Sequence, residues 1–266
     1  MPAELELPNA TSLSDKTDSM YTNGFAYFPN ALSPEHVSNL RSAIDNLEPL
    51  NNGFDFIDTP DNGGFYNKTV YNIFNHNPVF RDLLDVPEII DIAEAIHGND
   101  CHIIGMTAWV TGPGRPDQHL HCDWLPVELP EDVVSDDRVK MPIFASTAHF
   151  YLNDMYEDLG PTKFVPGSHL SGRLPGNDTI WKGEPEKSVI CKAGDALTFR
   201  SEIWHRGSSN KSSENRYLIQ VHYSQRMVTQ KFPPYLNEFQ FDPKIIDTST
   251  NRQKRLLGKH RRSSYD

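Results

Sequence analysis

The chain has 266 residues, and its 25 Lys and Arg against 36 Asp and Glu give a formal net charge of −11. An acidic chain is a poor candidate for general nucleic-acid binding, which needs basic charge to meet phosphates. The hydrophobic fraction of 37% and the aromatic fraction of 11% are enough to build a core, which excludes wholesale disorder.

The first third of the chain predicts a polar arm and two helices. Residues 1–19 carry no apolar pattern, so we expect a loose N-terminal arm. A helix is predicted to begin near Ser33, with a proline at its first position. Its apolar stripe consists of Val37, Leu40, Ile44 and Leu47. Residues 49–64 predict a loop, and a second helix is predicted from about Pro87 to His97.

From about residue 100 the pattern changes to short β-rich runs. These are HIIGMTAWVTG (102–112), STAHFYLND (146–154), SVICKAG (188–194), ALTFR (196–200) and RYLIQVHYS (216–224). Short strands without intervening helical patterns are typical of an antiparallel barrel or sandwich. No break in composition divides the chain, so we expect one domain over residues 1–266. Its β core is expected at about 100–226.

The remaining residues, 227–266, form an expected C-terminal extension. Within it, residues 251–262 contain six Lys or Arg and no acidic residue. This run predicts a solvated helix or tail, with a docking patch as the alternative.

The cysteines and the N-terminus bear on the compartment. Cys101, Cys122 and Cys191 are odd in number and form no CxxC motif, so neither a disulfide framework nor a cysteine-based zinc site is expected. The N-terminus lacks the basic and apolar regions of a secretory signal. No apolar run approaches the roughly 20 residues that a membrane helix needs. We therefore expect a cytoplasmic protein with no membrane partner.

The segment QHLHCDW, residues 118–124, carries the most specific chemistry. Residues two apart on a strand point to the same face, so His121 and Asp123 can converge on one metal ion. The chain offers His205 as a third ligand. Two imidazoles and one carboxylate form the facial triad of non-haem Fe(II) oxygenases, which leaves positions open for a co-substrate and O2. Alone, an HxD pattern also fits a polar strand edge.

Arg216 adds context to the triad. It lies 11 residues beyond His205, on the next predicted strand. A forked, permanently charged guanidinium suits a dicarboxylate co-substrate. Without the triad, a surface ion pair is the simpler interpretation of this arginine.

Together these residues resemble the phytanoyl-CoA dioxygenase family of Fe(II)/2-oxoglutarate oxygenases. Residues 160–169, GPTKFVPGSH, resemble the family's turn between the ligands, and residues 192–210 resemble its block around the distal histidine. The resemblance covers roughly residues 24–226. It departs from the family pattern at Leu159, where Asn is usual, and at Pro161, where small residues are common.

The resemblance implies a mainly-β fold, a double-stranded β-helix (jelly roll, cupin-like) with flanking N-terminal helices. It implies that His121, Asp123 and His205 bind Fe(II). The expected reaction oxidises a small-molecule substrate of secondary or specialised metabolism, most simply by hydroxylation, with consumption of O2 and release of succinate and CO2. Desaturation, ring formation or epoxidation would need the same residues. Halogenating relatives replace the carboxylate ligand with Gly or Ala, so Asp123 argues against halogenation.

The resemblance also implies the co-substrate site. Arg216 is expected to bind the distal carboxylate of 2-oxoglutarate, and Gln118 and Thr162 match positions that hydrogen-bond it in relatives. Simple strand alternation places Gln118 opposite His121, so a twist or a bulge is needed between them.

Three residues are candidate substrate contacts: Trp124, Tyr71 and Asn72. Core packing or turn formation is the competing interpretation for each. The loop 125–141 is acidic and is either a lid that favours a cationic substrate or a solvated loop.

Three further histidines lie near the motif or on predicted strands. His119 is either a rival ligand or a group that packs beside the site. His149 and His222 are interpreted as satisfied core histidines rather than ligands.

Two other function classes remain open from the sequence. One is a non-redox metal-dependent jelly-roll enzyme, which would not need 2-oxoglutarate. The other is a degenerate binding protein, which would tolerate changes at the ligand histidines.

Overall fold

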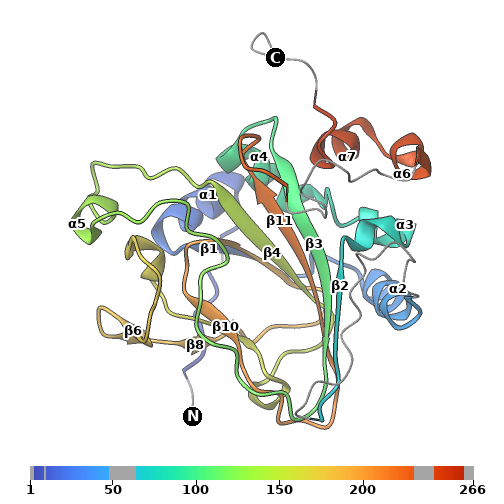
Figure 1. Cartoon of the computed structure of the whole chain (residues 1–266), viewed down its shortest axis with the longest axis horizontal. Helices are drawn as coiled ribbons and strands as arrows, with labels where there is room; N and C mark the ends of the chain where they lie inside the picture. Colours follow the sequence, from blue (N-terminus) through green and yellow to red (C-terminus); the bar gives the residue numbers. More distant parts are fainter. Residues whose placement is uncertain (1–2, 9, 48–63, 231–242, 261–266) are drawn as a thin grey trace.

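The structure, a computed structural model, describes residues 3–8, 10–47, 64–230 and 243–260. Two antiparallel sheets face each other at its centre (Figure 1). The large sheet has six strands in the order β1-β9-β4-β11-β3-β2, and the small sheet has three in the order β10-β5-β8. This arrangement confirms the expected mainly-β jelly roll. Apart from Gly64, the predicted loop at 49–64 lies outside the described residues.

The strands have the following bounds. The large sheet contains β1 (Phe25–Phe28), β2 (Asn67–Tyr71), β3 (His102–Thr111), β4 (Ala145–Tyr151), β9 (Ala196–Arg200) and β11 (Arg216–Ser224). The small sheet contains β5 (Thr162–Phe164), β8 (Lys187–Ser188) and β10 (His205–Gly207). A separate hairpin joins β6 (Ile180–Trp181) and β7 (Glu184–Pro185).

Most of the helices lie on the outer side of the large sheet, whereas the short helix Glu131–Val134 stands away from it (Figure 1). Those before β3 are α1 (Leu13–Thr22), α2 (Pro34–Asp45), α3 (Pro78–Arg81) and α4 (Pro87–His97), and those after it are α5 (Glu131–Val134), α6 (Pro243–Thr248) and α7 (Asn251–Leu256). Single turns occur at η1 (Ile73–Asn75), η2 (Glu157–Leu159) and η3 (Ser168–Leu170). Helices α2 and α4 confirm the two expected N-terminal helices, whereas α1 and α3 are not predicted from the sequence.

The two faces of the large sheet have different environments. On β3 and β11, alternate residues such as Met106, Ala108 and Val221 pack with the helices in the main hydrophobic core. The other set, which includes Trp109 and Arg216, faces the small sheet. Because side chains alternate along a strand, one strand contributes to the core and to the interior of the jelly roll.

The predicted start of the first helix and both predicted ends of the second are confirmed. Ser33 caps α2 by accepting a hydrogen bond from the backbone N–H of His36, and Pro34 follows it. Helix α4 runs from Pro87 to His97 and is capped by Gly98, whose φ of 100° favours glycine.

The predicted loose arm is wrong for residues 13–19, which belong to α1. The Ser12 side chain caps this helix by accepting from the N–H of Asp15. Lys16 forms an ion pair with Glu88 of α4, and Met20 is fully buried. The helix is held by these contacts with α4 and not by an apolar stripe of its own, which explains why the sequence pattern missed it.

The predicted strand SVICKAG is wrong beyond Ser188. The carboxylate of Asp195 accepts hydrogen bonds from the N–H groups of Lys192 and Asn30 and from the Tyr27 hydroxyl. These bonds, with Gly194 at a φ of 95°, form a turn in place of the end of the strand.

The large sheet extends beyond the expected core, because β1 and β2 precede residue 100.

Helix α7 confirms a helix in the basic C-terminal run, but this helix is not simply solvated. Leu256 is buried, and Arg252 and Arg255 form ion pairs with Glu94 of α4. Among the described residues, no helix has the length and apolar character needed to cross a bilayer.

Candidate active site

The HxD segment pairs with β10 and brings the three predicted ligands together. His121 and His205 exchange both backbone hydrogen bonds, with N–O distances of 3.0 and 2.8 Å. Nε2 of His205 lies 3.4 Å from Oδ1 of Asp123, and Nε2 of His121 lies 4.0 Å from the same oxygen. One ligand atom from each residue lies within 4.8 Å of the others. Among the described residues, this is the one cluster of at least three possible metal ligands.

Backbone carbonyls fix both imidazoles in the same tautomer. Nδ1 of His121 donates to the carbonyl of His119 at 2.8 Å, and Nδ1 of His205 donates to the carbonyl of Ile203 at 3.0 Å. A carbonyl oxygen only accepts, so the proton of each neutral ring sits on Nδ1. Each Nε2 therefore keeps a free lone pair for a metal ion.

Asp123 is oriented by a chain of two hydrogen bonds from the large sheet. The Thr147 hydroxyl donates to Oδ2 of Asp123 at 2.6 Å, and Nδ1 of His222 lies 3.0 Å from the same hydroxyl oxygen. Since that hydroxyl has one proton to donate, it must accept from His222. The chain occupies Oδ2 and leaves Oδ1 facing the two ligand histidines.

The electrostatics keep this carboxylate charged. Burial by itself raises the pKa of Asp123, but His205, His222 and the Thr147 hydrogen bond together hold the pKa well below its usual range. Burial by itself lowers the pKa of His205, but the Asp123 carboxylate raises it overall. The carboxylate thus favours a positive charge beside it, which protonation of His205 at Nε2 would supply in the metal-free protein and a metal cation would supply in its place.

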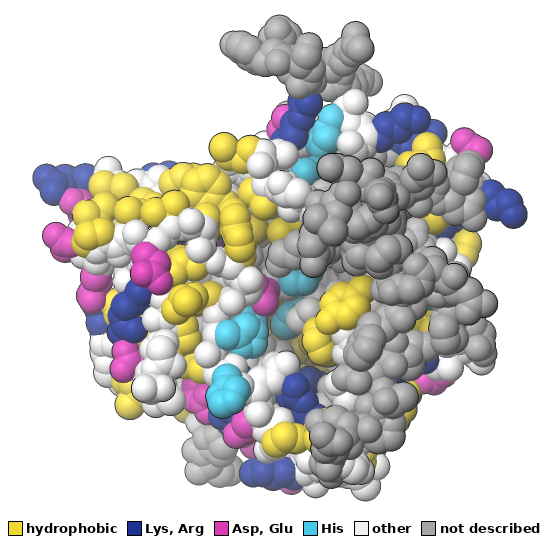
Figure 2. All heavy atoms as spheres, in the orientation of Figure 1, with side chains coloured by type: hydrophobic (Ala, Val, Ile, Leu, Met, Phe, Trp, Pro, Cys, Tyr) yellow, Lys and Arg dark blue, Asp and Glu magenta, His cyan; other side chains and the backbone are white. Residues whose placement is uncertain are grey.

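A cavity of about 130 Å³ connects this cluster to Arg216. Its lining includes Arg216, Gln118 and Thr162 together with the three metal-ligand candidates. Figure 2 shows histidine side chains near the centre of this face of the molecule. The side chain of His121 is 40% exposed, whereas that of His205 is 4% exposed, so the cluster is open on the His121 side.

Arg216 is a buried cation at the closed end of the cavity. Its guanidinium donates to the carbonyl of Gly160 and, at 3.3 Å, to the hydroxyl of Thr111. Burial and the neighbouring Arg115 lower the pKa of Arg216 to about 10. It forms no ion pair with the residues that the structure describes, so its charge is left for an anion in the cavity.

A bulge places Gln118 on the same side as His121. Its backbone N–H donates to the carbonyl of Gly207 at 2.9 Å, although regular pairing after His121 and His205 would put residue 119 there. Oε1 of Gln118 accepts from the N–H of Gly207 at 2.8 Å, which leaves its Nε2 as the donor for the cavity. Thr162 pairs with Gly207 from the other side, on β5.

His222 and Thr147 orient the carboxylate of Asp123. The sequence predicts His222 to be a core histidine and does not single out Thr147. A signal for His222 exists in the sequence, because it lies an even number of residues after Arg216 on one strand. Thr147 offers no such signal.

His149 also lies at the site, since it lines the cavity. Its Nε2 accepts from Gln220 at 2.8 Å, and Gln220 in turn accepts from the Trp109 indole. Nδ1 of His149 has no hydrogen-bond partner among the described residues, so the expectation of a satisfied core histidine is wrong for this atom. Burial lowers the pKa of His149 well below its usual value and keeps the ring neutral.

The other predicted site residues lie at different distances from the cavity. Trp124 is half-buried and makes an edge contact with Phe144. Tyr71 is exposed and pairs with Thr107 on the inner face of the large sheet. Asn72 is buried in a left-handed conformation at the start of η1 and does not line the cavity. The ring of His119 is exposed and is not part of the metal-ligand cluster.

The acidic loop 125–141 lies to one side of the cavity. Leu129 donates a backbone hydrogen bond to Gly172, and Glu131 forms an ion pair with Lys182. In Figure 1 its helix α5 stands away from β10 and β11. No residue of this loop is among those that line the cavity.

One family model matches most of the chain. The family model for phytanoyl-CoA dioxygenase (PhyH) matches residues 20–217. The chain belongs to the phytanoyl-CoA dioxygenase family. This match includes the three metal-ligand candidates, Arg216 and the turn that carries Thr162.

Curated relatives are distant. The chain is 24% identical over 205 residues to the dioxygenase trt7 of Aspergillus terreus, which covers 72% of this chain and 64% of the relative. It is 27% identical over 149 residues to the dioxygenase cdmA of Talaromyces verruculosus, which covers 55% of this chain and 46% of the relative. The chain thus spans about half to two thirds of the length of these relatives.

Solved structures share the fold. HygX from Streptomyces hygroscopicus, with nickel and 2-oxoglutarate bound, superposes with a TM-score of 0.65 at 16% identity, over 83% of this chain and 90% of the other. The epimerase SnoN, in complex with Fe3+, alpha ketoglutarate and nogalamycin RO, has a TM-score of 0.64 at 18% identity, over 87% and 92%.

Proposed function

We propose that this chain is a non-haem Fe(II)- and 2-oxoglutarate-dependent dioxygenase that hydroxylates a small molecule, with release of succinate and CO2. The observation that carries the proposal is the joint placement, in one cavity, of the His121–Asp123–His205 cluster and a buried Arg216 that has no acidic partner among the described residues. Family membership supports the same assignment.

The donor set fits Fe(II). Two imidazole nitrogens and one carboxylate oxygen suit this ion and leave coordination positions open. Cys122 stands between two of the ligands in sequence, but its Sγ donates to the carbonyl of Glu202 at 3.1 Å. Burial raises the pKa of this thiol to about 12, so it stays protonated and does not compete as a thiolate ligand.

The rest of the cavity fits 2-oxoglutarate. A dicarboxylate that meets the metal ion at one end offers a second carboxylate to Arg216 at the other. The amide of Gln118 and the hydroxyl of Thr162 add donors along the way. Burying an arginine without an acidic partner is costly, and an incoming carboxylate removes that cost.

With iron, O2 and 2-oxoglutarate bound, the cofactors supply the oxidising chemistry. The residues of the chain bind, orient and exclude water. Phe164 and Phe199 pack on the His205 ring, with centroid distances of 5.6 and 4.9 Å. They close the site on the His205 side, so the substrate approaches from the side of His121. Trp124 and Tyr71 remain our candidates for substrate contacts.

The reaction class is proposed as hydroxylation in specialised metabolism. Relatives in structure act in such chemistry, since SnoN is described as an epimerase from nogalamycin biosynthesis. Epimerisation or ring closure would use the same metal-ligand and co-substrate residues. Product analysis by mass spectrometry distinguishes them, because hydroxylation adds one oxygen atom and the others do not.

The test is anaerobic titration of the protein with Fe(II) and 2-oxoglutarate, read from the visible charge-transfer band. We expect a band in the wild type, loss of the band in Asp123→Ala, and at least a hundredfold weaker 2-oxoglutarate binding in Arg216→Met. A wild type without the band contradicts the proposal. Metal-dependent turnover without 2-oxoglutarate and O2 would instead support a non-redox enzyme.

A further inference from the structure

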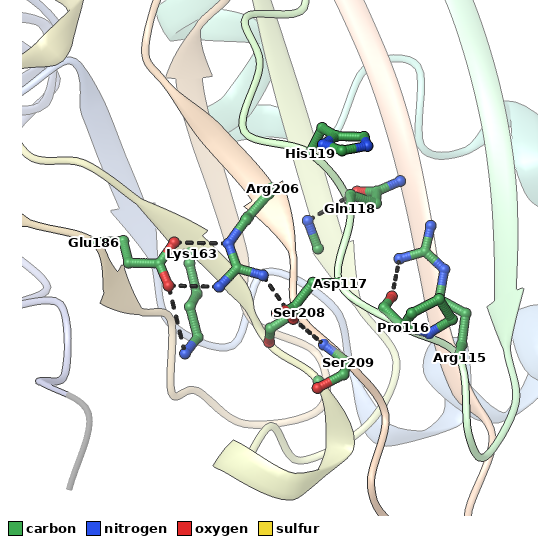
Figure 3. A network of polar contacts seen from close by, with 12 residues as sticks. Arg115, Pro116, Asp117, Gln118, His119, Lys163, Glu186, Arg206, Ser208 and Ser209 are labelled. Carbon is green, nitrogen blue, oxygen red and sulfur yellow. Dashed lines mark hydrogen bonds and ion pairs between the residues drawn. The ribbon is translucent and has the colours of Figure 1, made fainter. Parts of the chain in front are cut away.

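Arg206 is at the centre of a polar network on the outer side of β10 (Figure 3). Its Nε and Nη2 bind both carboxylate oxygens of Glu186, at 2.7 and 2.5 Å. Its Nη1 forms an ion pair with Oδ1 of Asp117 at 2.6 Å. One guanidinium thus joins two acidic residues that are 69 positions apart in the sequence.

The two acidic residues belong to different parts of the site. Glu186 precedes β8 at the edge of the small sheet, where Lys163 of β5 also lies 4.0 Å from its carboxylate. Asp117 directly precedes Gln118, and its Oδ1 also accepts from the backbone N–H of Ser209 at 2.7 Å. The fork of Arg206 therefore anchors the segment before the metal ligands to the small sheet.

Arg206 itself does not reach the cavity. It lies between His205 and Gly207 on β10, and alternation along the strand turns these two neighbours inward and Arg206 outward. Its side chain is 14% exposed. Any effect of Arg206 on the chemistry must pass through the residues that it holds.

Gln118 directly follows Asp117 and lines the cavity. It is attached to β10 by two bonds with Gly207, one from its backbone and one to its side chain. The bulge before His121 has no regular sheet pairing to define its register. The Arg206–Asp117 contact and the Ser209–Asp117 bond supply that restraint from the outer side.

We propose that Arg206 is a positioning residue that, through Asp117, fixes Gln118 at the co-substrate site. This inference rests on the proposed function for the identity of the co-substrate. It assigns no direct contact between Arg206 and any ligand.

The experiment uses two variants of the full chain. Asp117→Asn keeps an acceptor for Ser209 and removes the charge that Arg206 binds, and Arg206→Met removes the fork. We expect each to weaken 2-oxoglutarate binding about fivefold or more, read from the charge-transfer band, while kcat at saturating co-substrate stays within twofold of the wild type. Both changes break the same Arg206–Asp117 contact. The double variant should therefore bind 2-oxoglutarate with an affinity within twofold of that of Arg206→Met.

The matched control is Asp136→Asn. Asp136 forms a similar ion pair with Arg138 in the loop 125–141, and the substitution removes the negative charge of that pair. It should leave 2-oxoglutarate binding within twofold of the wild type. Unchanged binding in both Arg206→Met and Asp117→Asn overturns the inference, as does an equal loss in the control. If Arg206→Met fails to fold, Asp117→Asn decides, since the Asp117 side chain is 53% exposed.

A second measurement does not depend on the co-substrate. Hydrogen exchange of metal-free protein should be faster over residues 115–121 in Asp117→Asn than in the wild type and in Asp136→Asn. Unchanged exchange there overturns the inference. A wild type that gives no charge-transfer band contradicts the proposed function, and the exchange result then still decides whether Arg206 holds this segment.

Discussion

Replacing Thr147 by valine tests how the carboxylate ligand is oriented. Valine keeps the shape of threonine and removes the hydroxyl that donates to Oδ2 of Asp123 at 2.6 Å. Thr147 is fully buried, so water cannot easily replace the lost donor. A hydrogen bond to a charged group is worth about 1.5–3 kcal/mol. We therefore expect metal affinity to fall by roughly 10- to 100-fold.

The assay is an anaerobic titration of the metal-free protein with a divalent metal, in which calorimetry measures the binding. Thr198→Val is the matched control, because Thr198 is also fully buried, lies on the neighbouring strand β9 and has a hydroxyl with no partner among the described residues. It should bind metal as the wild type does. If Thr147→Val also bound metal with wild-type affinity, the assigned role of the His222–Thr147–Asp123 chain would be refuted.

Three further results are expected. Burial lowers the pKa of His97 to about 4. As pH falls from 7 to 5, this histidine therefore takes up a proton in the unfolded state but not in the folded state. The free energy of unfolding should fall by about 2 kcal/mol over this range. Urea unfolding at both pH values should show this loss in the wild type and a smaller one in His97→Gln; equal losses would contradict it. In Gly207→Ala the new Cβ would lie 2.9 Å from Oε1 of Gln118 and displace that side chain. We expect 2-oxoglutarate binding to weaken about tenfold while the unfolding midpoint stays the same. Unchanged binding in the titration would count against the assigned position of Gln118. Adding a divalent metal at a hundred times its Kd should stabilise the wild type by about 2.7 kcal/mol in thermal unfolding and leave Asp123→Ala unshifted, whereas an equal shift in both would place the metal elsewhere.

The metal-ligand cluster could be predicted from the sequence because its information is local. His121 and Asp123 are two residues apart, and their spacing alone places them on one face of an extended segment. The sequence also predicts that a twist or a bulge separates Gln118 from His121, but not its cause, because that depends on pairing with Gly207.

The parts that could not be predicted depend on contacts between distant segments. Helix α1 has one strongly buried apolar residue, Met20, and a lysine that pairs with α4, so no periodic pattern marks it. Thr147 is one of many threonines until the fold brings it to Asp123. Asp195 converts an expected strand into a turn through bonds to Tyr27 and Asn30, which are about 165 residues away.

The odd- and even-numbered residues of strand β11 face opposite sides of the large sheet and serve different purposes. Ile219, Val221 and Tyr223 are in the helix-covered core, whereas Arg216, Gln220 and His222 face the jelly-roll interior. A saturation mutational scan of this strand should therefore alternate with a period of two. Substitutions at the odd positions should lower the amount of protein that accumulates in cells, and those at the even positions should lower turnover per molecule.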